Sequence, residues 1–443
     1  MEERSVQPQI LGVSTATPPQ ASPDDEFLTA KDAAELLDVK LPTVYAYTSR
    51  GLIQSVPGSR GRARLYRRRD LERLCARRDA RAGHGPVAAA ALRQGEPVLD
   101  SSITLISIEE GPIYRGRSAL GLAREGRSFE WVAEGLWSGN WLADDAVPDW
   151  RTESLGLDLD LLQRLVSSKG GPLPVLSIII PLLAVEDPGR FSSSPDAVLA
   201  RSRALLRCLV ASLALGREVD DPALAAAAVR ASLESASLAA ALGVAFSRVL
   251  DQDELLVLNR ALVLTADHEL NASTFAARVT ASTGADIYCC ISAALATLSG
   301  PRHGGAADRV DALLEEAGTA ERVLGVIHDR QRRGEVIEGF GHPIYAPHSD
   351  PRGQLLMKIA CELPGAASRV QPVVALVDAM AAGGFGGPTI DVGLVAVTRA
   401  LALPTGTATA LFAIGRSVGW VAHVREQQEA GYLVRPRARY RET

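Results

Sequence analysis

Residues 300–306 read Gly-Pro-Arg-His-Gly-Gly-Ala, which places His303 between glycines. About forty residues later, Gly339-Phe340-Gly341-His342 repeats the arrangement, and Asp391 follows within Pro388-Thr389-Ile390-Asp391. A ligand can approach the backbone closely where a histidine is flanked by glycines. The chain has only seven histidines, so two in such settings indicate a site. Two imidazoles and a downstream carboxylate suit paired acid and base chemistry on a carbonyl substrate.

Length and composition indicate a large helical protein. The 443 residues suffice for two or three domains with a sizeable core. An apolar fraction of 47% with 5% aromatics and long Ala/Leu tracts predicts a mostly helical, soluble protein. Residues 1–24 lack the apolar core of a signal peptide, and the apolar run 172–185 is too short to span a bilayer. Five cysteines without metal-ligand spacing indicate reduced thiols and a cytoplasmic location.

Charge is distributed unevenly along the chain. Between Arg50 and Arg81 there are eleven arginines and three acidic residues, although the whole chain carries a net charge of −5. The remainder is therefore acidic. Such asymmetry suggests a segment that faces nucleic acid, attached to a different module.

This basic segment lies in a predicted small domain, residues 25–78. Thr29 can cap a first helix, Pro42 suits the first turn of a second, and Gly51 ends it. The predicted elements are, in order, a helix over 31–37, a helix over 43–50, a hairpin over 57–62, a strand over 63–66 and a helix from about 69.

The arrangement resembles the winged helix-turn-helix of MerR-type and excisionase-like DNA-binding domains. The matching residues include Leu28-Thr29, Ala33-Ala34, Thr43-Val44-Tyr45 and Gly51-Leu52-Ile53. In that family the second helix enters the major groove and the wing contacts the backbone or the minor groove. The resemblance implies DNA contacts by Thr43, Tyr45, Tyr47, Arg50, Arg60, Arg62 and Arg64. The alternative is a solvated basic face on a protein-interaction domain.

The rest of the chain reads as a tail, a linker and one long helix-rich region. Residues 1–24 are predicted to be disordered, 79–96 to be a linker, and 97–443 to form the helical part. The helical part opens with a β-like stretch at 101–106, and helical periodicity follows over 197–215, 222–242 and 251–264.

A resemblance to citrate synthases covers residues 97–440, with every block in the family's order. The run 266–279, ADHELNASTFAARV, looks like the family's "aDHe-x-NaSTf-x-aRv", and 300–306 matches "GPlHGGA". Further blocks lie at 113–116, 128–133, 339–352, 388–391, 416–423 and 435–436. The fold implied is mainly α, with a large and a small helical domain in a homodimer. The small domain would span about 304–398 and close over CoA.

The resemblance also implies a reaction and roles. Such an enzyme condenses acetyl-CoA, or a short acyl-CoA, with oxaloacetate and hydrolyses the thioester to citrate or 2-methylcitrate plus CoA. By matching position, Asp391 is the base, His303 the donor to the thioester oxygen, and His342 the group that polarises the ketone. Oxaloacetate would be held by His268, Arg352, Arg416 and, across the dimer, Arg435. Gly339, Phe340 and Gly341 would lie against CoA. No metal and no bound redox cofactor is expected.

Several positions depart from the family's pattern. Arg302 stands where leucine is usual, and either lowers the protonation of His303 or binds a CoA phosphate. Pro343 follows His342 in place of arginine, the loop 346–349 is one residue longer, and Thr389 replaces asparagine. The run 383–387, Gly-Gly-Phe-Gly-Gly, lacks the lysine of a phosphate-binding loop and reads as the approach to Asp391.

Two other functions fit the same residues. One is a metabolite-sensing transcriptional regulator that uses the synthase fold to sense and the basic domain to bind DNA. The other is the reverse reaction, a cleavage of citrate or citryl-CoA.

Overall fold

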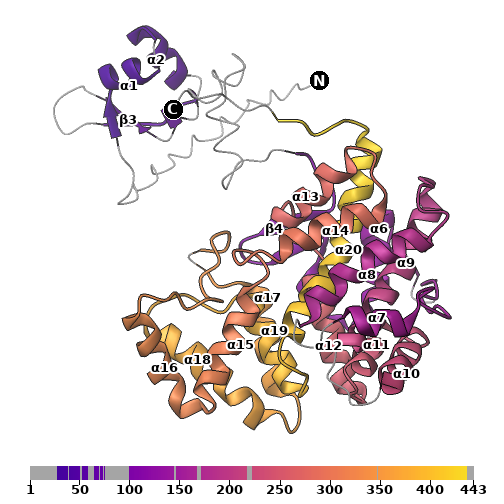
Figure 1. Ribbon diagram of the computed structural model, residues 1–443. Helices are drawn as coiled ribbons and strands as arrows, with labels where there is room; N and C mark the ends of the chain where they lie inside the picture. Colours follow the sequence, from indigo (N-terminus) through magenta and orange to yellow (C-terminus); the bar gives the residue numbers. More distant parts are fainter. Residues whose placement is uncertain are drawn as a thin grey trace, which may run out of the picture. The chain divides into compact units, whose positions relative to one another are not determined.

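The structure is a computed structural model. It describes residues 27–37, 39–49, 52–57, 64–68, 70–72, 74, 99–143, 146–166, 171–216, 222–346 and 348–436. The predicted tail 1–24 and linker 79–96 lie outside these residues. The chain divides into two compact units, one of residues 1–100 with 437–443 and one of residues 101–436 (Figure 1).

The first unit contains two short helices and a small antiparallel sheet. The helices are α1 (Ala30–Leu36) and α2 (Leu41–Ser49), and the strands are β1 (Phe27–Thr29), β2 (Ser55–Pro57) and β3 (Arg64–Arg67). The strand order is β1-β3-β2, so β3 is central and its Tyr66 pairs with both Leu28 and Ser55. Residues 70–72 are helical, as predicted for the segment after the wing.

Local sequence explains most of this unit. Thr29 caps α1 in a capping box with Asp32, as the predicted cap requires. Ala33, Val44, Ile53 and Tyr66 form the core. Strand β1 was not predicted, because its partner β3 lies about forty residues away and three residues carry no periodic signal of their own.

The second unit begins with a three-stranded antiparallel sheet. Its strands are β4 (Thr104–Ser107), β5 (Gly111–Tyr114) and β6 (Arg117–Ser118), in the order β4-β5-β6. The predicted β-like stretch at 101–106 therefore corresponds to β4, shifted by a few residues.

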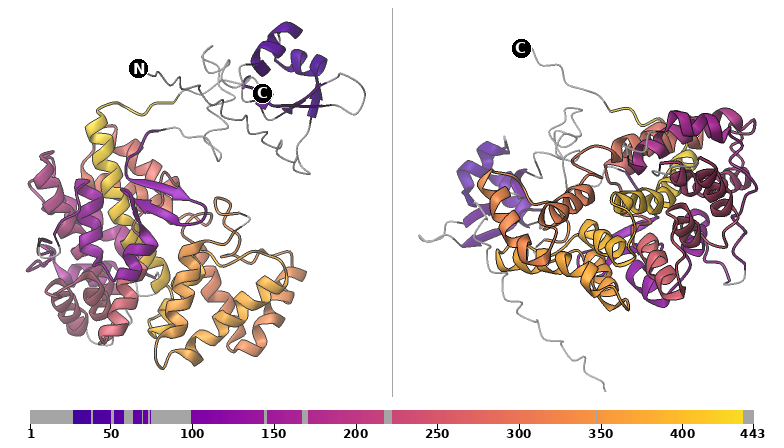
Figure 2. Two further views of the ribbon diagram at one scale, coloured as in Figure 1. Left: turned by 180° about the vertical axis from the view of Figure 1, so that it is seen from behind. Right: turned by 60° about the horizontal axis from the view of Figure 1, so that its bottom comes forward.

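A first group of helices surrounds the long C-terminal helix α20 (Figures 1 and 2). Helix α20 spans Thr407–Ala430. The other helices of the group are α5 (Ala119–Glu125), α6 (Phe129–Ser138), α7 (Leu159–Leu165), α8 (Pro172–Glu186), α9 (Pro195–Ser212), η2 (Leu213–Gly216), α10 (Pro222–Leu233), α11 (Leu238–Ala245), α12 (Gln252–Thr265), α13 (Ala272–Ala281) and α14 (Ile287–Leu298). Every residue of α20 from 407 to 424 is buried, so this helix is the axis of the core.

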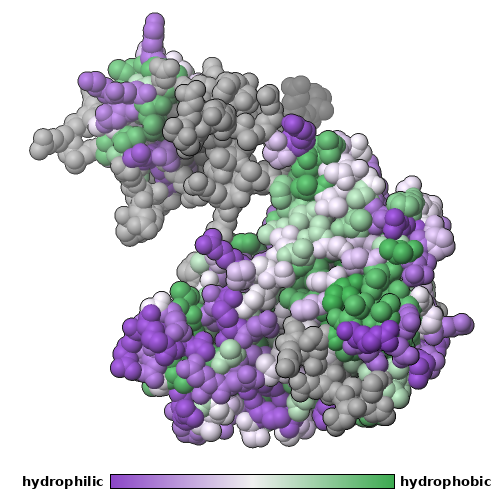
Figure 3. Space-filling model, viewed as in Figure 1, coloured by the Kyte–Doolittle hydropathy of each residue, from purple (hydrophilic) through white to green (hydrophobic). Residues whose placement is uncertain are grey.

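A second group packs together beside the first. It comprises α15 (Ala306–Ala317), α16 (Ala320–Arg332), α17 (Pro351–Glu362), α18 (Ala367–Ala382) and α19 (Ile390–Ala400). Its span lies close to the 304–398 expected for a small domain. Hydrophilic side chains gather over α16 and α18, whereas larger apolar areas lie over the first group (Figure 3).

The helix predicted over 222–242 is in fact two helices. Helix α10 ends at Leu233, and Ser237 caps α11 by accepting a hydrogen bond from the Ala240 amide. The buried Arg207 guanidinium donates to the carbonyls of Ser232 and Ser237, which satisfies backbone groups at the break. No helix among the described residues is long and apolar enough to cross a membrane.

Candidate active site

Three aromatic side chains from two segments meet at the site. His268 lies in the loop between α12 and α13, and its Nε2 is 2.7 Å from the Tyr345 hydroxyl. The ring centroids of His268 and His342 are 5.4 Å apart, and those of His342 and Tyr345 are 5.1 Å apart. Burial first, then the charges of Arg352 and Arg416, hold the pKa of His268 well below its usual value. The structure thus brings together His268 and His342, two of the residues that the sequence analysis assigned to oxaloacetate.

A buried ion pair borders this cluster. Asp350 caps α17, and its carboxylate accepts hydrogen bonds from Arg352 Nε at 3.0 Å and Nη2 at 2.8 Å. Burial alone would raise the pKa of Asp350, but the Arg352 guanidinium lowers it below its usual value overall. Arg352 Nη1 is buried and has no hydrogen-bond partner among the described residues. A buried N–H group without a hydrogen-bond partner destabilises the protein, so an anionic ligand that accepts from this group recovers the lost free energy.

Arg416 brings a second buried guanidinium, from α20. Its Nε donates to the Thr265 carbonyl at 2.9 Å, and its guanidinium carbon lies 4.8 Å from the Phe412 ring centroid. Burial lowers the pKa of Arg416 to about 10, and the Asp267 carboxylate opposes that shift. The side chain is therefore cationic at neutral pH. Two buried arginines suit a dicarboxylate ligand.

His303 lies just before α15 and is held by a hydroxyl. Its Nε2 is 2.8 Å from Ser273 Oγ, which also accepts from Trp420 Nε1 at 3.1 Å. Burial and then the charge of Arg416 lower the pKa of His303 to about 4. The imidazole is therefore neutral at pH 7 and can donate a hydrogen bond from one ring nitrogen.

The prediction that Arg302 lowers the protonation of His303 is wrong. The pKa of His303 is lowered, but by burial and by another arginine. Arg302 is exposed, in a turn where the His303 amide bonds the Gly300 carbonyl. The cation that adds to burial is Arg416. The alternative, that Arg302 binds a CoA phosphate, stays a prediction.

Asp391 lies at the start of α19 beside the glycine-rich segment. The Thr389 hydroxyl donates to Asp391 Oδ2 at 3.0 Å, and the Ile390 amide donates to Asp350 Oδ2 at 3.2 Å. Burial raises the pKa of Asp391, while the bond from Thr389 opposes that rise. The base candidate is therefore connected through the backbone to the Asp350–Arg352 pair.

Backbone pairing joins the predicted CoA segment to the approach to Asp391. The Thr389 amide donates to the Gly339 carbonyl at 2.8 Å, and Phe340 bridges to Pro388. Gly339 has φ +89° and stands so near Val310 and Val392 that a side chain would collide with them. Gly341 also has a positive φ, +70°. Glycine is required at position 339, and the positive φ favours it at position 341.

Other predicted residues lie elsewhere. Arg435 is exposed after α20, and no contact among the described residues joins it to the site within one chain. In the first unit Tyr45 is exposed, Thr43 is half-buried, and Tyr47 packs against the core. Arg64 is exposed on β3, whereas Arg50, Arg60 and Arg62 lie outside the described residues.

Sequence reasoning missed several residues of the site. Tyr345, Asp350, Ser273 and Trp420 all lie inside the quoted motifs, but none was assigned a role. A signal was available for two of them. Tyr345 follows His342 by three residues, and Asp350 precedes Pro351 as a helix cap does. Nothing local predicted that Ser273 and Trp420 would meet His303.

Comparisons with known proteins identify a family for each of the two parts of the chain. A family model described as citrate synthase, C-terminal domain, matches residues 91–437, and one described as a helix-turn-helix domain matches residues 27–79. Citrate synthase of Haloferax volcanii is 31% identical over 78% of this chain and 94% of its own length. Citrate synthase 2 of Bacillus subtilis is 38% identical over 42% of this chain, a match that spans about half of that relative (51%).

Solved structures show the same fold. Citrate synthase of Thermoplasma acidophilum, in a ternary complex with carboxymethyl coenzyme A and oxaloacetate, has a TM-score of 0.67 and 25% identity, covering 80% of this chain and 96% of that one. Citrate synthase of Thermotoga maritima has a TM-score of 0.63 and 26% identity, covering 79% and 95%. The chain therefore belongs to the citrate synthase family, with a helix-turn-helix domain preceding the synthase region.

Proposed function

We propose that the protein condenses acetyl-CoA, or a short acyl-CoA, with oxaloacetate and hydrolyses the resulting thioester to citrate, or 2-methylcitrate, and CoA. The observation that carries the proposal is Arg352, a buried guanidinium with one N–H group unpaired beside His268 and His342. The homology to citrate synthases and the ligands of the Thermoplasma complex support the same reading.

Arg352 and Arg416 bind the two carboxylates of oxaloacetate, and His268 adds a further contact. Fixed guanidinium groups suit carboxylates because they offer paired hydrogen bonds at a fixed charge. His342 faces the ketone oxygen. Burial and then the charge of Arg352 lower its pKa, so it is neutral and polarises the ketone by a hydrogen bond.

The thioester is activated by Asp391 and His303. Asp391 removes the α-proton of the acyl group, while His303 donates a hydrogen bond to the enolate oxygen that forms. This role requires the Ser273 hydroxyl to donate its proton to His303 Nε2 instead of to Asn271 Oδ1, which lies at the same distance of 2.8 Å. Nδ1 then carries the ring proton and is the donor. The α-carbon then bonds the ketone carbon, and the ketone oxygen takes up one proton to become a hydroxyl, which balances the α-proton transferred to Asp391. Water cleaves the thioester bond and releases CoA.

CoA lies against Gly339, Phe340 and Gly341 in this proposal, and the helices α15–α19 form the body that closes over it. The contacts between this segment and Pro388–Thr389 would move the CoA site and Asp391 as one piece. No metal or bound redox cofactor enters any step.

The test is turnover by the purified full chain. Oxaloacetate with acetyl-CoA, or with propionyl-CoA, should release one free thiol per product, measured with a thiol reagent and confirmed by mass spectrometry of the acid formed. Absence of CoA release with both acyl-CoAs would contradict the proposal.

The protein acts as a homodimer in this proposal, with Arg435 completing the partner's site. Helix α8 supports it, because the helix is apolar nearly all round yet Ile178 and Leu182 are only partly buried and Val185 is 71% exposed. A helix that is apolar on every face belongs in an interior. Light scattering after gel filtration should give twice the chain mass of 46.9 kDa.

The cysteines support a cytoplasmic location. Cys208, Cys289, Cys290 and Cys361 are all free in the described part of the chain, as is usual in a reducing compartment.

A second function, DNA binding by the first unit, is supported by the helix-turn-helix match and the exposed Tyr45 on α2. We expect Thr43, Tyr45 and Arg50 to face the major groove and Arg60, Arg62 and Arg64 to contact phosphates. The groove contact predicted for Tyr47 is not part of this proposal, because Tyr47 packs against the core. Sequence-selective, salt-sensitive binding measured by fluorescence anisotropy should be lost when Arg60, Arg62 and Arg64 become alanine. Turnover by the same variant should not change.

A further inference from the structure

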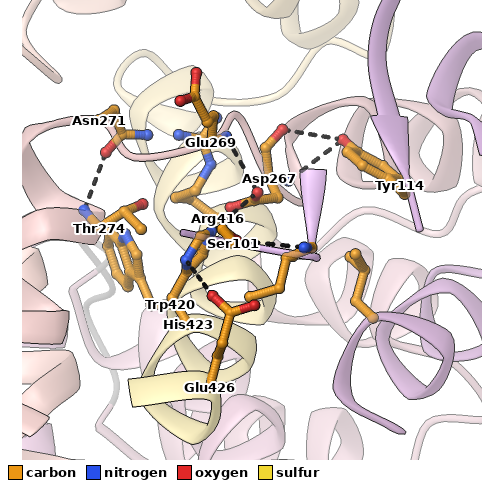
Figure 4. A network of polar contacts seen from close by, with 12 residues as sticks. Ser101, Tyr114, Asp267, Glu269, Asn271, Thr274, Arg416, Trp420, His423 and Glu426 are labelled. Carbon is orange, nitrogen blue, oxygen red and sulfur yellow. Dashed lines mark hydrogen bonds and ion pairs between the residues drawn. The ribbon is translucent and has the colours of Figure 1, made fainter. Parts of the chain in front are cut away.

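A buried polar network joins the loop of Asp267 and Glu269 to His423 on α20 (Figure 4). Asp267 and His423 are both fully buried, and His423 Nε2 is 3.3 Å from Asp267 Oδ2. Asp267 immediately precedes His268, but the two side chains have different partners. His268 contacts the Tyr345 hydroxyl, whereas Asp267 contacts His423 on α20. The proposed chemistry uses neither Asp267 nor His423.

The loop that carries Asp267 and His268 is fixed at successive residues. Arg416 Nε bonds the Thr265 carbonyl and the Gly419 amide bonds the Ala266 carbonyl, each at 2.9 Å. The Tyr114 hydroxyl lies 3.3 Å from the Asp267 amide and 3.2 Å from its carbonyl. Gly419 permits this approach, because a side chain there would overlap Asp267.

The same loop contains strained backbone. Glu269 has φ +57°, a conformation uncommon outside glycine, and its amide donates to Asp267 Oδ2 at 3.1 Å. Such strain persists only where the surroundings over-determine it, and it concentrates at functional sites. The Asp267 carboxylate therefore holds the strained turn on one side and His423 on the other.

A second pair lies on the other side of His423. Glu426 Oε2 is 4.0 Å from His423 Nδ1 and 2.8 Å from Arg278 Nη1, and Glu426 Oε1 accepts from the Ser102 amide at 2.7 Å. This pair joins α20 to α13 and to the start of the β4 segment. It offers a matched control, since it lies one turn of helix farther from His268.

We propose that Asp267 and His423 are positioning residues that set His268 and the neighbouring Arg416 for the keto-acid substrate. The inference rests on the proposed function. A buried ionisable pair is weak support for stability, because apolar side chains of equal volume serve as well. A strained loop that is held by α20 on one side and by Tyr114 on the other, by contrast, fixes the position of the His268 ring in the site. His303 is fixed separately, through Ser273 and Trp420.

The test compares four variants of the full chain. His423→Leu removes the hydrogen bond, and His423→Gln keeps an N–H near the position of Nε2. Tyr114→Phe releases the loop from the other side without changing the ring. Glu426→Gln is the control. The measurements are kcat, KM for each substrate, oxaloacetate Kd by calorimetry, and Tm.

We expect His423→Leu to raise the KM and Kd for oxaloacetate about tenfold to 100-fold, since small misplacements of a binding group have effects of this size. Tyr114→Phe should act in the same direction, and His423→Gln should restore near-normal values. In all three, KM for acetyl-CoA should stay within about twofold of the wild type. Glu426→Gln should lower Tm with the oxaloacetate Kd unchanged.

Folded Tyr114→Phe and His423→Leu proteins that bind oxaloacetate as the wild type does would overturn the inference. Equal losses of oxaloacetate affinity in Glu426→Gln and His423→Leu would do so as well. If His423→Leu does not fold, Tyr114→Phe decides alone. A wild-type protein that neither binds oxaloacetate nor turns over would instead remove the proposed function, and the inference with it.

Discussion

The two halves of the candidate site are held in different ways. On the keto-acid side, His268, His342, Tyr345 and the Asp350–Arg352 pair contact one another and are mostly buried. On the thioester side, His303 and Asp391 each meet a single hydroxyl, from Ser273 and Thr389. In the first half, the Asp350–Arg352 ion pair holds a charged group in place. In the second half, the hydroxyls of Ser273 and Thr389 influence the protonation of His303 and Asp391. Mutations should therefore change binding and stability in one half and rate in the other.

The largest expected effect is on rate, in Asp391→Ala. Loss of a general base lowers kcat by about 10² to 10⁴. Oxaloacetate binding measured by calorimetry should persist, because the keto-acid half is intact. Asp378→Ala, an exposed carboxylate on α18, is the matched control and should turn over normally. Equal loss of oxaloacetate affinity in Asp391→Ala would show that the halves are not separable.

A somewhat smaller effect on rate is expected for His303→Ala. Removal of one donor to a developing oxyanion costs about 10² to 10³ in kcat. His303 is half-buried and its partner Ser273 keeps its bond from Trp420, so Tm should hardly move. A large fall in Tm would mean that this histidine is mainly structural.

Substitutions in the keto-acid half of the site should lower the free energy of unfolding. Arg352→Gln leaves Asp350 buried without its cation, which costs about 3–5 kcal/mol of unfolding free energy in urea titrations. The double variant Arg352→Gln, Asp350→Asn should recover part of that loss but not oxaloacetate binding. Unchanged stability in the single variant would show that the ion pair does not organise this half.

The smallest effect concerns pH and Thr389. The Thr389 hydroxyl stabilises the charged form of Asp391 and so lowers its pKa, against the effect of burial. Thr389→Val should raise that pKa further, so the acid limb of the kcat/KM profile moves to higher pH. Activity should fall more at pH 6 than at pH 8, by less than about tenfold. Thr389→Ser should keep the wild-type profile.

Much of the site was predictable from motifs, because its residues lie in short runs with distinctive neighbours. His303, which precedes Gly304-Gly305, and His342, which follows Gly341, could be found without a structure. The motif of His342 also contains Gly339, where no side chain fits. The contacts between runs were not predictable. Ser273 meets His303 and Trp420 only because α13 and α20 pack together.

The small helix-turn-helix unit shows the same division. Its capping box at Thr29 follows from local sequence, whereas the pairing of β1 with β3 and the packing of Tyr47 against the core depend on the fold.

By itself, the sequence determined the family, the order of the chemical groups and the glycines that the backbone requires, since these depend on residues close in the chain. Only the tertiary structure decided protonation and pairing. Burial, and then the charge of Arg416 instead of that of Arg302, lowers the pKa of His303, and Asp267 bonds His423 across 156 residues. Burial and charges that act through space determine the pKa of His303 and the pairing of Asp267 with His423. Neither burial nor such charges depend on distance along the sequence.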